Sequence, residues 1–570
     1  MIATCQRRTL MERTLPTVVR QRFDPTQFEI VVVVDGSSDG TIEMLASTQS
    51  PCALRVITQA KDGLGAAMNA GVAATRGEIV LLLADDLVCS PELIDQHVSA
   101  HRGLADAVVF GPVRIAPDAP RSGTALLKRE WADRYFDLLD AGQEPSWPAH
   151  AFVAGNCSLR RATFLSEGGF DADVARMSED AELGTRLWKR GTRFVYRHEA
   201  VAHHLYTRSS EHFIDAEAER YGRAEVRMAR RHPEYRPHCT VATLGRGPWH
   251  RRLVRQLLVR APRPVDRPLA IVCAIAERFS WSDGALRVAA RLLQVRWRIR
   301  VLAAARREAG SWKALAAEFG RRLPVLLYHH VGPPAGLGGL SIDPARFRRD
   351  MSVLAGLGYE AITPRQWEAW RLQASPLPPR PVLITFDDGY ADTCAYVPPV
   401  LERYGYPAAM FVVSGLVGRT NEWDERLGRP SLRLATWDAL RRLEAANVEL
   451  GSHGRSHRSF VGLAPDELRG EISSSKEELS AVTSPVSSLA YPFGHAPADA
   501  VALVKQSYSL AFTTEPGIND LSTDPLRLRR IMVQPNTIPM DLWLQLRLGF
   551  SPLLRSRAFV ARLRSRLRGA

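Results

Sequence analysis

The chain has 570 residues, of which 45% are hydrophobic and 24% are charged, an ordinary globular balance with ample apolar material for two or three domains. The formal net charge of +14 at pH 7 favours an anionic partner, such as a membrane surface, a nucleotide-sugar, a polyanionic glycan or nucleic acid. Nucleic acid is the weakest of these, and we expect none, because the sequence contains no zinc-finger spacing and no RNP-type aromatic motif.

Cysteine usage and hydropathy both predict a cytoplasmic protein. The seven cysteines are scattered along the chain without a C-x-x-C pair, which indicates reduced thiols. Residues 1–15 contain no apolar core of signal-peptide length. The apolar run at residues 268–276 is too short to span a bilayer, so we expect no transmembrane helix.

Two predicted strands in the first part of the chain end in acidic residues. Residues 28–34 form a near-continuous β-branched run, as expected for a buried parallel strand, and Asp35 opens the turn that follows. Residues 79–83 form a second such run, which is followed by Asp85 and Asp86. Ligands of open α/β sheets bind outside the carboxyl ends of the strands, so both acidic clusters are predicted to lie on the same rim.

The segments VVVVDGSSDGT, LLADDLV and SEDAELGTRL together resemble family 2 glycosyltransferases with the GT-A fold, over about residues 2–235. The resemblance implies that Asp35 contacts the uracil or ribose of a nucleotide-sugar donor. It also implies that Asp86, together with Asp85, carries Mg²⁺ or Mn²⁺ on the diphosphate, and that Asp180 deprotonates the acceptor hydroxyl for inverting transfer. The chemistry is consistent, since a hard cation neutralises a leaving diphosphate and a carboxylate activates a hydroxyl. From the residues alone, the acidic run around Asp180 fits the first turn of a helix equally well.

This first part departs from the family pattern in three places. Val34 stands where many members have a first Asp, and Ala84 stands at the first D-x-D position. Only Met1 and Ile2 remain of the strand that normally opens such a sheet. We therefore expect apolar residues in frame upstream of Met1.

Two pairs of polar residues are weaker candidates. The resemblance implies that Gly155 and Asn156 line the acceptor side of the site. His203 and His204 follow the predicted helix. We expect them to form a surface pair, and an approach to the site is the alternative.

Residues 246–322 differ in character from the rest of the chain. Residues 262–268 are rich in proline and predict a hinge. Residues 285–307 are apolar at helical spacing with interleaved arginines, and residues 553–568 repeat this pattern. Such helices either pack on a domain with solvated arginines or lie flat on anionic lipid, which would give peripheral binding at the inner face of the cell membrane.

In the second half of the chain, two carboxylates follow a buried strand. The apolar run at residues 382–386 ends in Asp387 and Asp388. Adjacent carboxylates repel each other and burial disfavours their charged forms, but a bound metal removes the difficulty. A solvated Asp-Asp-Gly turn is the alternative. His453 and His457 follow another short apolar segment, and one Asp with two His is a three-ligand metal set with an open position.

The segments TFDDG, GSHGRSH and AYPFG, in this order, resemble the polysaccharide deacetylase family with the NodB homology domain, over about residues 324–531. The resemblance implies a distorted (β/α) barrel with the site at the carboxyl ends of its strands. It implies that Asp387 is the general base, that Asp388, His453 and His457 hold a Zn²⁺-like ion, and that the Phe493 backbone N–H helps to bind the oxyanion.

Two departures affect this second site. Ala490 stands where the family has the Arg that partners the catalytic Asp, so this partner is missing from the motif. The late Leu-x-His of the family has no match at residues 526–530, so the general acid is unassigned. His329, His330 and His495 are candidates, each of which fits a structural or rim position better.

The sequence thus predicts an α/β protein with three parts. Residues 1–240 form a glycosyltransferase domain, residues 241–322 a basic helical linker, and residues 323–570 a deacetylase domain with a basic C-terminal helix. The predicted function is bifunctional assembly of a surface polysaccharide or glycolipid, by sugar transfer to a glycan or lipid-linked saccharide and by N-deacetylation of an amino sugar. The alternatives are a degenerate glycan-binding scaffold in one or both domains, and O-acetyl esterase activity.

Overall fold

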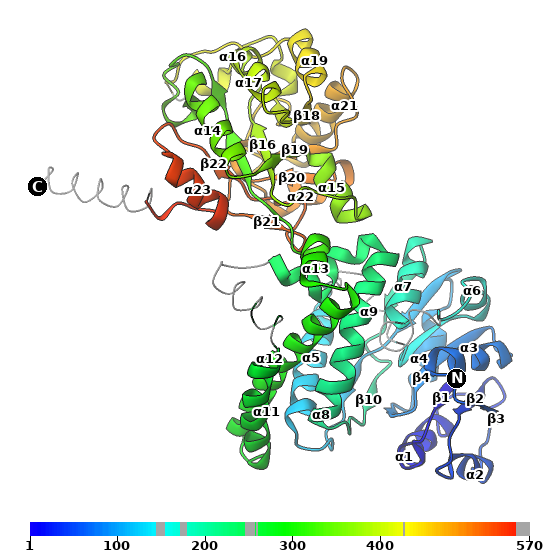
Figure 1. The fold of residues 1–570 in the computed structure, drawn as a ribbon. Helices are drawn as coiled ribbons and strands as arrows, with labels where there is room; N and C mark the ends of the chain where they lie inside the picture. The colour runs from blue at the N-terminus through cyan, green and yellow to red at the C-terminus, as the bar shows by residue number, and fades with distance from the viewer. Residues whose placement is uncertain are drawn as a thin grey trace, which may run out of the picture. The chain divides into compact units, whose positions relative to one another are not determined.

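The computed structural model describes residues 1–143, 154–171, 179–245, 262–425 and 428–553, together with residues 257 and 260 (Figure 1). The chain divides into two compact units. The first consists of the described residues within Met1–Val241 and Arg255–Trp312, and the second of those within Ala242–Val254 and Lys313–Ala570. The predicted basic helix after Leu553 lies outside the described residues.

The first unit is built on a seven-stranded sheet with the order β3-β2-β1-β4-β8-β6-β9. β1 to β4 run parallel, whereas β8 runs antiparallel to both of its neighbours. The strands are β1 (Ile2–Thr4), β2 (Glu29–Asp35), β3 (Ala53–Gln59), β4 (Ile79–Ala84), β6 (Ala107–Phe110), β8 (Asn156–Arg160) and β9 (Arg193–Tyr196). A three-stranded sheet consists of β5 (Leu87–Cys89), β10 (Ala202–His204) and β7 (Val113–Ile115).

The side chains of β2 show why this sheet has a core on each face. Val33 belongs to one hydrophobic cluster, whereas Val32 and Val34 belong to the other. Successive side chains of a strand point to opposite faces, so a strand of apolar residues must be covered on both sides. The flanking helices are α1 (Arg8–Val19), α2 (Thr41–Ala46), α3 (Leu64–Ala74), α4 (Leu93–Ala100), α5 (Gly123–Asp140), α6 (Arg161–Ser166) and α7 (Glu179–Lys189).

The helices that end the first unit correct one prediction. After α8 (Ser210–His212) and α9 (Ala218–Arg231), residues 262–268 do not form a hinge, because they are the start of α11 (Pro262–Arg278). The described part of α11 begins at Pro262, and Pro268 lies inside the helix.

The predicted apolar helix at residues 285–307 is α12 (Asp283–Glu308). Its buried face includes Leu286, Ala289 and Leu293, and the buried Arg296 forms an ion pair with Asp266 of α11 at 2.9 Å. The structure therefore favours, for α12, the alternative of a helix packed on its own unit over that of a helix lying flat on lipid.

The second unit is built on a curled parallel sheet with the order β20-β19-β18-β17-β16-β12-β22, and β15 also pairs with β16. This confirms the predicted α/β class with a distorted barrel. The strands are β12 (Val325–Tyr328), β15 (Glu360–Ala361), β16 (Pro381–Phe386), β17 (Ala408–Val412), β18 (Val448–Ser452), β19 (Ser488–Ala490), β20 (Leu510–Phe512) and β22 (Ile531–Met532). Short pairs are formed by β11 (Arg322–Leu323) with β21 (Asn519–Asp520) and by β13 (His330–Val331) with β14 (Ser341–Ile342).

Helices surround this sheet, and a large hydrophobic cluster fills the space between them. The helices are α13 (Trp312–Phe319), α14 (Pro344–Gly356), α15 (Pro364–Gln373), α16 (Ala391–Tyr396), α17 (Pro398–Glu402), α18 (Glu422–Glu425), α19 (Trp437–Ala445), α20 (Pro465–Arg469), α21 (Ser475–Ser480), α22 (Ala498–Ser507) and α23 (Pro539–Leu548).

The segment at residues 525–533 connects the two edges of the curled sheet. On one side, the Leu528 N–H donates to the Ala511 carbonyl and the Leu528 carbonyl accepts from the Thr513 N–H, both at 2.8 Å. On the other side, Ile531 of β22 pairs with Leu326 of β12. Arg530 therefore stands where the two edges approach each other. None of the helices in the described ranges combines the length and the apolar character needed to cross a bilayer.

Candidate active sites

Parallel strands deliver the predicted metal site to one edge of the second sheet. β16 ends at Phe386, directly before Asp387 and Asp388, and β18 ends at Ser452, directly before His453. Because β16, β17 and β18 run parallel, the ends of β16 and β18 lie at the same edge. Sequence reasoning placed these residues correctly because each directly follows its strand.

Three side chains converge at this edge. Asp388 Oδ1 lies 3.4 Å from His453 Nε2 and 3.2 Å from His457 Nε2. One ligand atom from each of these buried residues lies within 4.8 Å of the other two. Asp388 Oδ1 is buried and has no hydrogen-bond partner among the described residues. A carboxylate oxygen and two imidazole nitrogens directed at one point fit a Zn²⁺-like ion.

The surroundings of His453 fix its role in this cluster. Its Nδ1 lies 2.8 Å from the Ala490 carbonyl and donates to it, so Nε2 of the neutral ring presents a lone pair toward Asp388. Burial lowers the pKa of His453, but Asp387 and Asp388 outweigh it and hold the pKa above its ordinary value. The site therefore attracts positive charge, and a metal ion would compete with the imidazole proton.

Backbone strain is concentrated around this cluster. Three of the six non-glycine residues with positive φ in the described part of the chain are Asp388 (74°), His457 (58°) and Phe493 (58°). Such conformations cost about 1–3 kcal/mol each and persist where the surrounding structure imposes them, commonly at functional sites. Phe493, which is 45% exposed, has its ring centroid 4.8 Å from that of His457, and Trp423 stacks on His457 at 4.2 Å.

The missing partner of Asp387 is supplied by a residue that sequence reasoning did not identify. Arg530 donates through Nη1 to Asp387 Oδ1 at 2.7 Å and through Nη2 to Oδ2 at 2.8 Å. Its Nε donates to the Thr513 carbonyl at 2.8 Å, and its side chain is 0% exposed. Burial alone would raise the pKa of Asp387, but the charges of Arg530 and His453 hold this pKa below its ordinary value.

The expectation that the Asp partner is lost with Ala490 is therefore wrong. Arg530 occurs in LRLRR, where a buried arginine cannot be told from an exposed one by sequence. The sequence offered one signal that Arg530 is buried. It directly precedes the apolar run Ile531–Val533, which has the pattern of a buried strand.

The three candidate histidines differ in their position relative to Asp387. His329 directly follows β12, which pairs in parallel with β16, so it lies at the edge that carries Asp387. Burial lowers the pKa of His329, and the Asp388 and Asp387 carboxylates oppose this effect. His330 is instead held by the Ser341 hydroxyl and the Asp392 carboxylate, and His495 is exposed.

In the first unit, Asp35 and Asp85 lie on one rim, as predicted, because β2 and β4 both pair in parallel with β1. Asp35 is 4% exposed, and its carboxylate accepts hydrogen bonds from the Gln59 side chain and from the N–H groups of Asp62 and Gly63, at 2.8–2.9 Å. It thus fixes the loop that leads into α3. Gly36, with φ of 66°, belongs to the same turn, and a Cβ there would lie only 2.7 Å from the Lys61 Cβ.

Arg7 connects the two carboxylates of the second acidic cluster. Its Nη1 lies 2.7 Å from both Asp85 Oδ1 and Asp86 Oδ2. Thr4 donates to Asp85 at 2.7 Å, and His204 Nε2 lies 3.1 Å from Asp86 Oδ2. His204 therefore follows the alternative of approaching the site rather than the expected surface position. The carboxylates suit Mg²⁺ or Mn²⁺, although Arg7 already compensates their charge.

Asp180 lies in the first turn of α7. Burial, followed by repulsion from Glu179, raises its pKa to about 7.

The expectation that Asn156 lines the acceptor side of the site is wrong. Asn156 is fully buried, and its side chain contacts His97 Nε2 and the Ala200 carbonyl. It fixes the connection between strands rather than lining a site.

Comparisons with known proteins agree with both predicted domains. Residues 1–167 match the family model of glycosyl transferase family 2, and residues 374–508 match that of polysaccharide deacetylase. The chain therefore contains a family 2 glycosyltransferase domain followed by a polysaccharide deacetylase domain, and both predicted resemblances are confirmed.

Individual relatives match one half of the chain each. YxkH of Bacillus subtilis (strain 168), named as a polysaccharide deacetylase, is 26% identical over 216 residues, covering 38% of this chain and 72% of YxkH. Validoxylamine A glucosyltransferase of Streptomyces hygroscopicus subsp. limoneus is 29% identical over 283 residues, covering 43% of this chain and 59% of that enzyme. This chain thus spans less than two thirds of the length of that glucosyltransferase. The solved structure of Streptococcus pyogenes deacetylase PplD in complex with acetate is 22% identical, with 40% of this chain and 98% of PplD covered and a TM-score of 0.35.

Proposed function

We propose that the chain is a bifunctional enzyme of surface-polysaccharide or glycolipid assembly. Residues 1–240 transfer a sugar from a nucleotide-sugar to a glycan or lipid-linked saccharide, residues 323–570 remove an N-acetyl group from an amino sugar, and residues 241–322 link them. The observation that carries this proposal is the presence of both family domains in one chain, the second with a converged Asp-His-His cluster. Linking the two activities raises the effective concentration of the second site for the first product.

In the deacetylase domain, Asp388, His453 and His457 would hold the divalent cation. When bound, a Zn²⁺-like ion supplies a Lewis acid that polarises the amide carbonyl and lowers the pKa of water. Asp387 is the general base: its ionised carboxylate accepts the proton of the attacking water, and Arg530 keeps it ionised and oriented. The Phe493 N–H donates to the developing oxyanion, a type of contact that contributes about 3–4 kcal/mol.

His329 is the best-placed group to return a proton to the leaving amine. It lies at the edge that carries Asp387, whereas His330 and His495 are engaged elsewhere or exposed. A proton given to the amine nitrogen allows the C–N bond to break without expulsion of an amide anion. Arg530 supplies the arginine partner that Asp387 is expected to have. The lack of an arginine at position 490 therefore no longer favours a degenerate, non-catalytic domain.

Activity assays on the purified chain test the two reactions separately. We expect acetate release from N-acetylated oligosaccharides, and nucleotide release from one member of a panel of UDP-sugars when an acceptor is present. Acetate release from O-acetylated glycans alone would replace deacetylation by esterase activity. Binding of glycans without turnover of any substrate, in protein that contains metal, would contradict the enzyme assignment.

In the glycosyltransferase domain, the rim of the sheet binds the donor. Asp35 holds the Gln59–Gly63 loop, which would contact the nucleoside. Asp85 and Asp86 would hold Mg²⁺ or Mn²⁺, which when bound neutralises negative charge on a diphosphate. Arg7 lies between these two carboxylates and is also placed to contact diphosphate oxygens. Asp180 is the base that deprotonates the acceptor hydroxyl.

The raised pKa of Asp180 predicts a specific pH dependence of glycosyl transfer. The base must be ionised, so kcat/KM should fall as the pH decreases through about 7. Asp180→Asn should abolish transfer while donor affinity, measured by calorimetry, stays unchanged. Glu179→Gln is the matched control: it removes a repelling charge and should move the midpoint to lower pH without loss of the maximal rate. If Glu179→Gln leaves the midpoint of the pH profile unchanged, the pH dependence does not arise from ionisation of Asp180.

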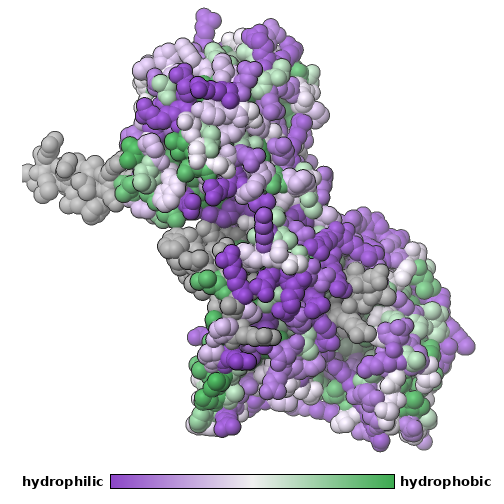
Figure 2. Space-filling view, viewed as in Figure 1, coloured by the Kyte–Doolittle hydropathy of each residue, from purple (hydrophilic) through white to green (hydrophobic). Residues whose placement is uncertain are grey.

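We also propose a cytoplasmic location with peripheral contact to an anionic membrane. The outer face of α11 carries Ile271, Val272 and Ile275, and Phe279 directly follows the helix. These four residues are 49–63% exposed, and Trp281 is 78% exposed. Figure 2 shows hydrophobic residues gathered where α11 lies. Exposed arginines also occur along α11 and α12, namely Arg267, Arg278, Arg287, Arg291 and Arg298. Exposed apolar side chains on helices that also carry exposed arginines favour an anionic lipid surface.

Co-sedimentation with liposomes tests this contact. Binding should require anionic lipid and weaken with salt, since each arginine near the surface contributes about 1 kcal/mol. Phe279→Asp should reduce binding at least tenfold, because a buried Phe contributes about 1.5–3 kcal/mol. Deletion of the residues after Leu553 should reduce it further. Leu372→Asp, on the exposed face of α15, is the control, and equal loss in both variants would contradict a role for α11.

A further inference from the structure

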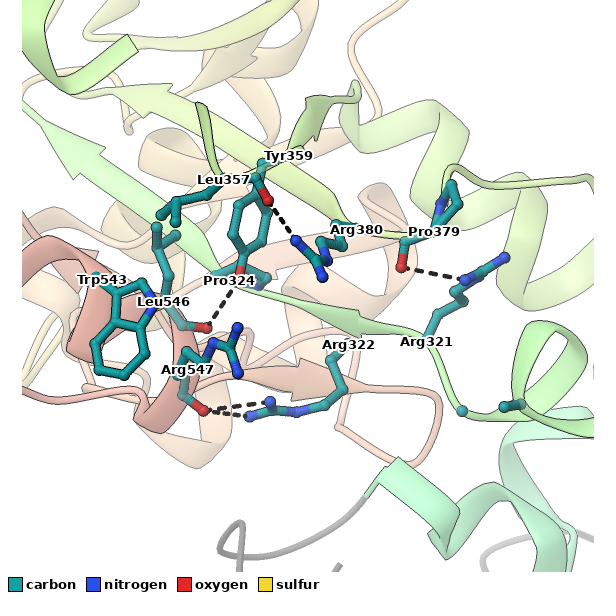
Figure 3. Close-up of a pocket in the computed structure, with 12 residues that line it drawn as sticks. Arg321, Arg322, Pro324, Leu357, Tyr359, Pro379, Arg380, Trp543, Leu546 and Arg547 are labelled. Atoms are coloured by element: carbon teal, nitrogen blue, oxygen red, sulfur yellow. Dashed lines mark hydrogen bonds between the residues drawn. The ribbon is translucent and has the colours of Figure 1, made fainter. Parts of the chain in front are cut away.

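The second unit contains a hollow of about 370 Å³ whose lining is unusually rich in arginine. It lies between α13, α23 and the residues that precede three strands (Figure 3). Pro324 precedes β12, Tyr359 precedes β15 and Arg380 precedes β16. These strands run parallel, so their starts meet at the edge opposite to Asp387 and Asp388. The hollow is therefore separate from the metal-ligand cluster. We call it the arginine pocket.

Four guanidinium groups line the arginine pocket, and backbone carbonyls hold three of them in place. Arg321 donates to the Pro379 carbonyl at 3.1 Å, Arg322 to the Arg547 carbonyl at 3.3 Å, and Arg380 to the Leu357 carbonyl at 2.5 Å. The Arg547 guanidinium lies 5.3 Å from the centre of the Trp543 ring. Carbonyl contacts orient the arginines without cancelling their charge.

For three of the four arginines, no carboxylate of the described residues compensates the charge. Arg321, Arg380 and Arg547 form no ion pair with any carboxylate of the described chain, and no acidic residue lines the pocket. The Nε of Arg321 is buried without a hydrogen-bond partner there, and burial lowers the pKa of this arginine. A buried donor without an acceptor needs an explanation, and a bound anion supplies one.

Tyr359 shows that the charges act on the interior of the pocket. Burial raises the pKa of its hydroxyl, and Arg322, Arg547 and Arg380 oppose this effect. The one acidic neighbour in sequence, Glu360, acts instead on the Tyr406 hydroxyl. The pocket thus combines a positive interior with the polar edge of Tyr359 and the ring of Trp543.

We propose that the arginine pocket binds a phosphoryl group. Guanidinium groups match the oxygens of phosphate with paired, charge-assisted hydrogen bonds, and several of them together suit a dianion better than a single carboxylate. The volume lies within the range of small-ligand sites and exceeds what one phosphate needs, so the ligand is a phosphate ester or a diphosphate. Two sources share this chemistry, a soluble phosphate ester and the headgroup of a lipid.

Calorimetry with inorganic pyrophosphate tests the site in the full-length protein. Removal of one charge-assisted contact should weaken binding about tenfold in Arg547→Gln and in Arg380→Gln. Arg403→Gln is the matched control, an exposed arginine elsewhere on the same unit, and should bind as the wild type does. Pyrophosphate bound at the glycosyltransferase rim is common to all these proteins and cancels in the comparison. Unchanged thermal unfolding midpoints show that the variants are folded.

Chemical protection then locates the ligand, and vesicles identify its source. Pyrophosphate should protect Arg547 and Arg380 from phenylglyoxal, as read by peptide mass mapping. Weaker sedimentation of Arg547→Gln than of Arg403→Gln with phosphatidic acid vesicles assigns the site to a lipid phosphate. Equal sedimentation, with pyrophosphate binding still weakened in Arg547→Gln, assigns it to a soluble phosphate ester. Equal pyrophosphate affinity in Arg547→Gln and Arg403→Gln, or no protection of either pocket arginine, overturns the proposal.

Discussion

Replacement of His453 by alanine is expected to remove the metal from the deacetylase domain and to abolish acetate release. The imidazole supplies one of three converging donor atoms, and a site left with two protein ligands binds a divalent cation far more weakly. The substitution removes a side chain at the end of a strand and leaves the cluster of apolar residues behind it intact, so the unfolding midpoint of the apoprotein should change little. Metal content by elemental analysis and acetate release are the two measurements.

Asp387→Asn is the matched comparison for this prediction. This substitution changes the residue next to Asp388 and leaves the ligand atoms of Asp388, His453 and His457 in place. The metal content should therefore remain at about one ion per chain. Acetate release should nevertheless fall by about 10²–10⁴-fold, because the amide cannot accept a proton from water. Full metal and activity in His453→Ala would show that the Asp-His-His cluster is not the metal site. Wild-type turnover in Asp387→Asn would remove Asp387 from the role of base.

The sequence was sufficient where a site residue directly follows its own strand. Asp387, Asp388 and His453 come immediately after apolar runs, so their common edge follows from the parallel arrangement of β16 and β18. Asp35 and Asp85 were predictable on one rim for the same reason. In each case local pattern and sheet topology lead to the same answer.

Contacts between distant segments were not predictable in this way. Arg530 lies 143 residues from Asp387 along the chain, and the two meet because residues 525–533 connect the edges of the curled sheet. His204 reaches Asp86 through the short sheet of β10 and β5, which no periodicity indicated. The proline-rich start of α11 shows the opposite error. Its composition predicts a hinge, yet these residues are helical and Pro268 lies inside the helix.

Arg530 and Asp387 form a buried pair, and this has a consequence for stability as well as for catalysis. Arg530→Gln leaves a carboxylate that is 2% exposed without its charged partner, so the domain should lose about 3–5 kcal/mol of unfolding free energy. Because the folded-state pKa of Asp387 lies below its ordinary value, the stabilisation is present above the unfolded-state pKa of about 4 and is lost as the pH falls through the folded-state pKa. The difference between wild type and Arg530→Gln should therefore be largest near neutral pH and narrow in acid.

A double-mutant cycle separates this pairing from other roles of Arg530. In the background of Asp387→Asn the buried negative charge is absent, so Arg530→Gln should cost much less than in the wild type, with a coupling energy of about 1–3 kcal/mol in urea unfolding. Arg530→Lys keeps the charge but not the two parallel hydrogen bonds, and should retain most of the stability while acetate release falls, because Asp387 is no longer held in one orientation. If the two substitutions are additive, Arg530 acts through its contact with Thr513 and through packing. In that case another group must keep the Asp387 carboxylate ionised in the interior of the barrel.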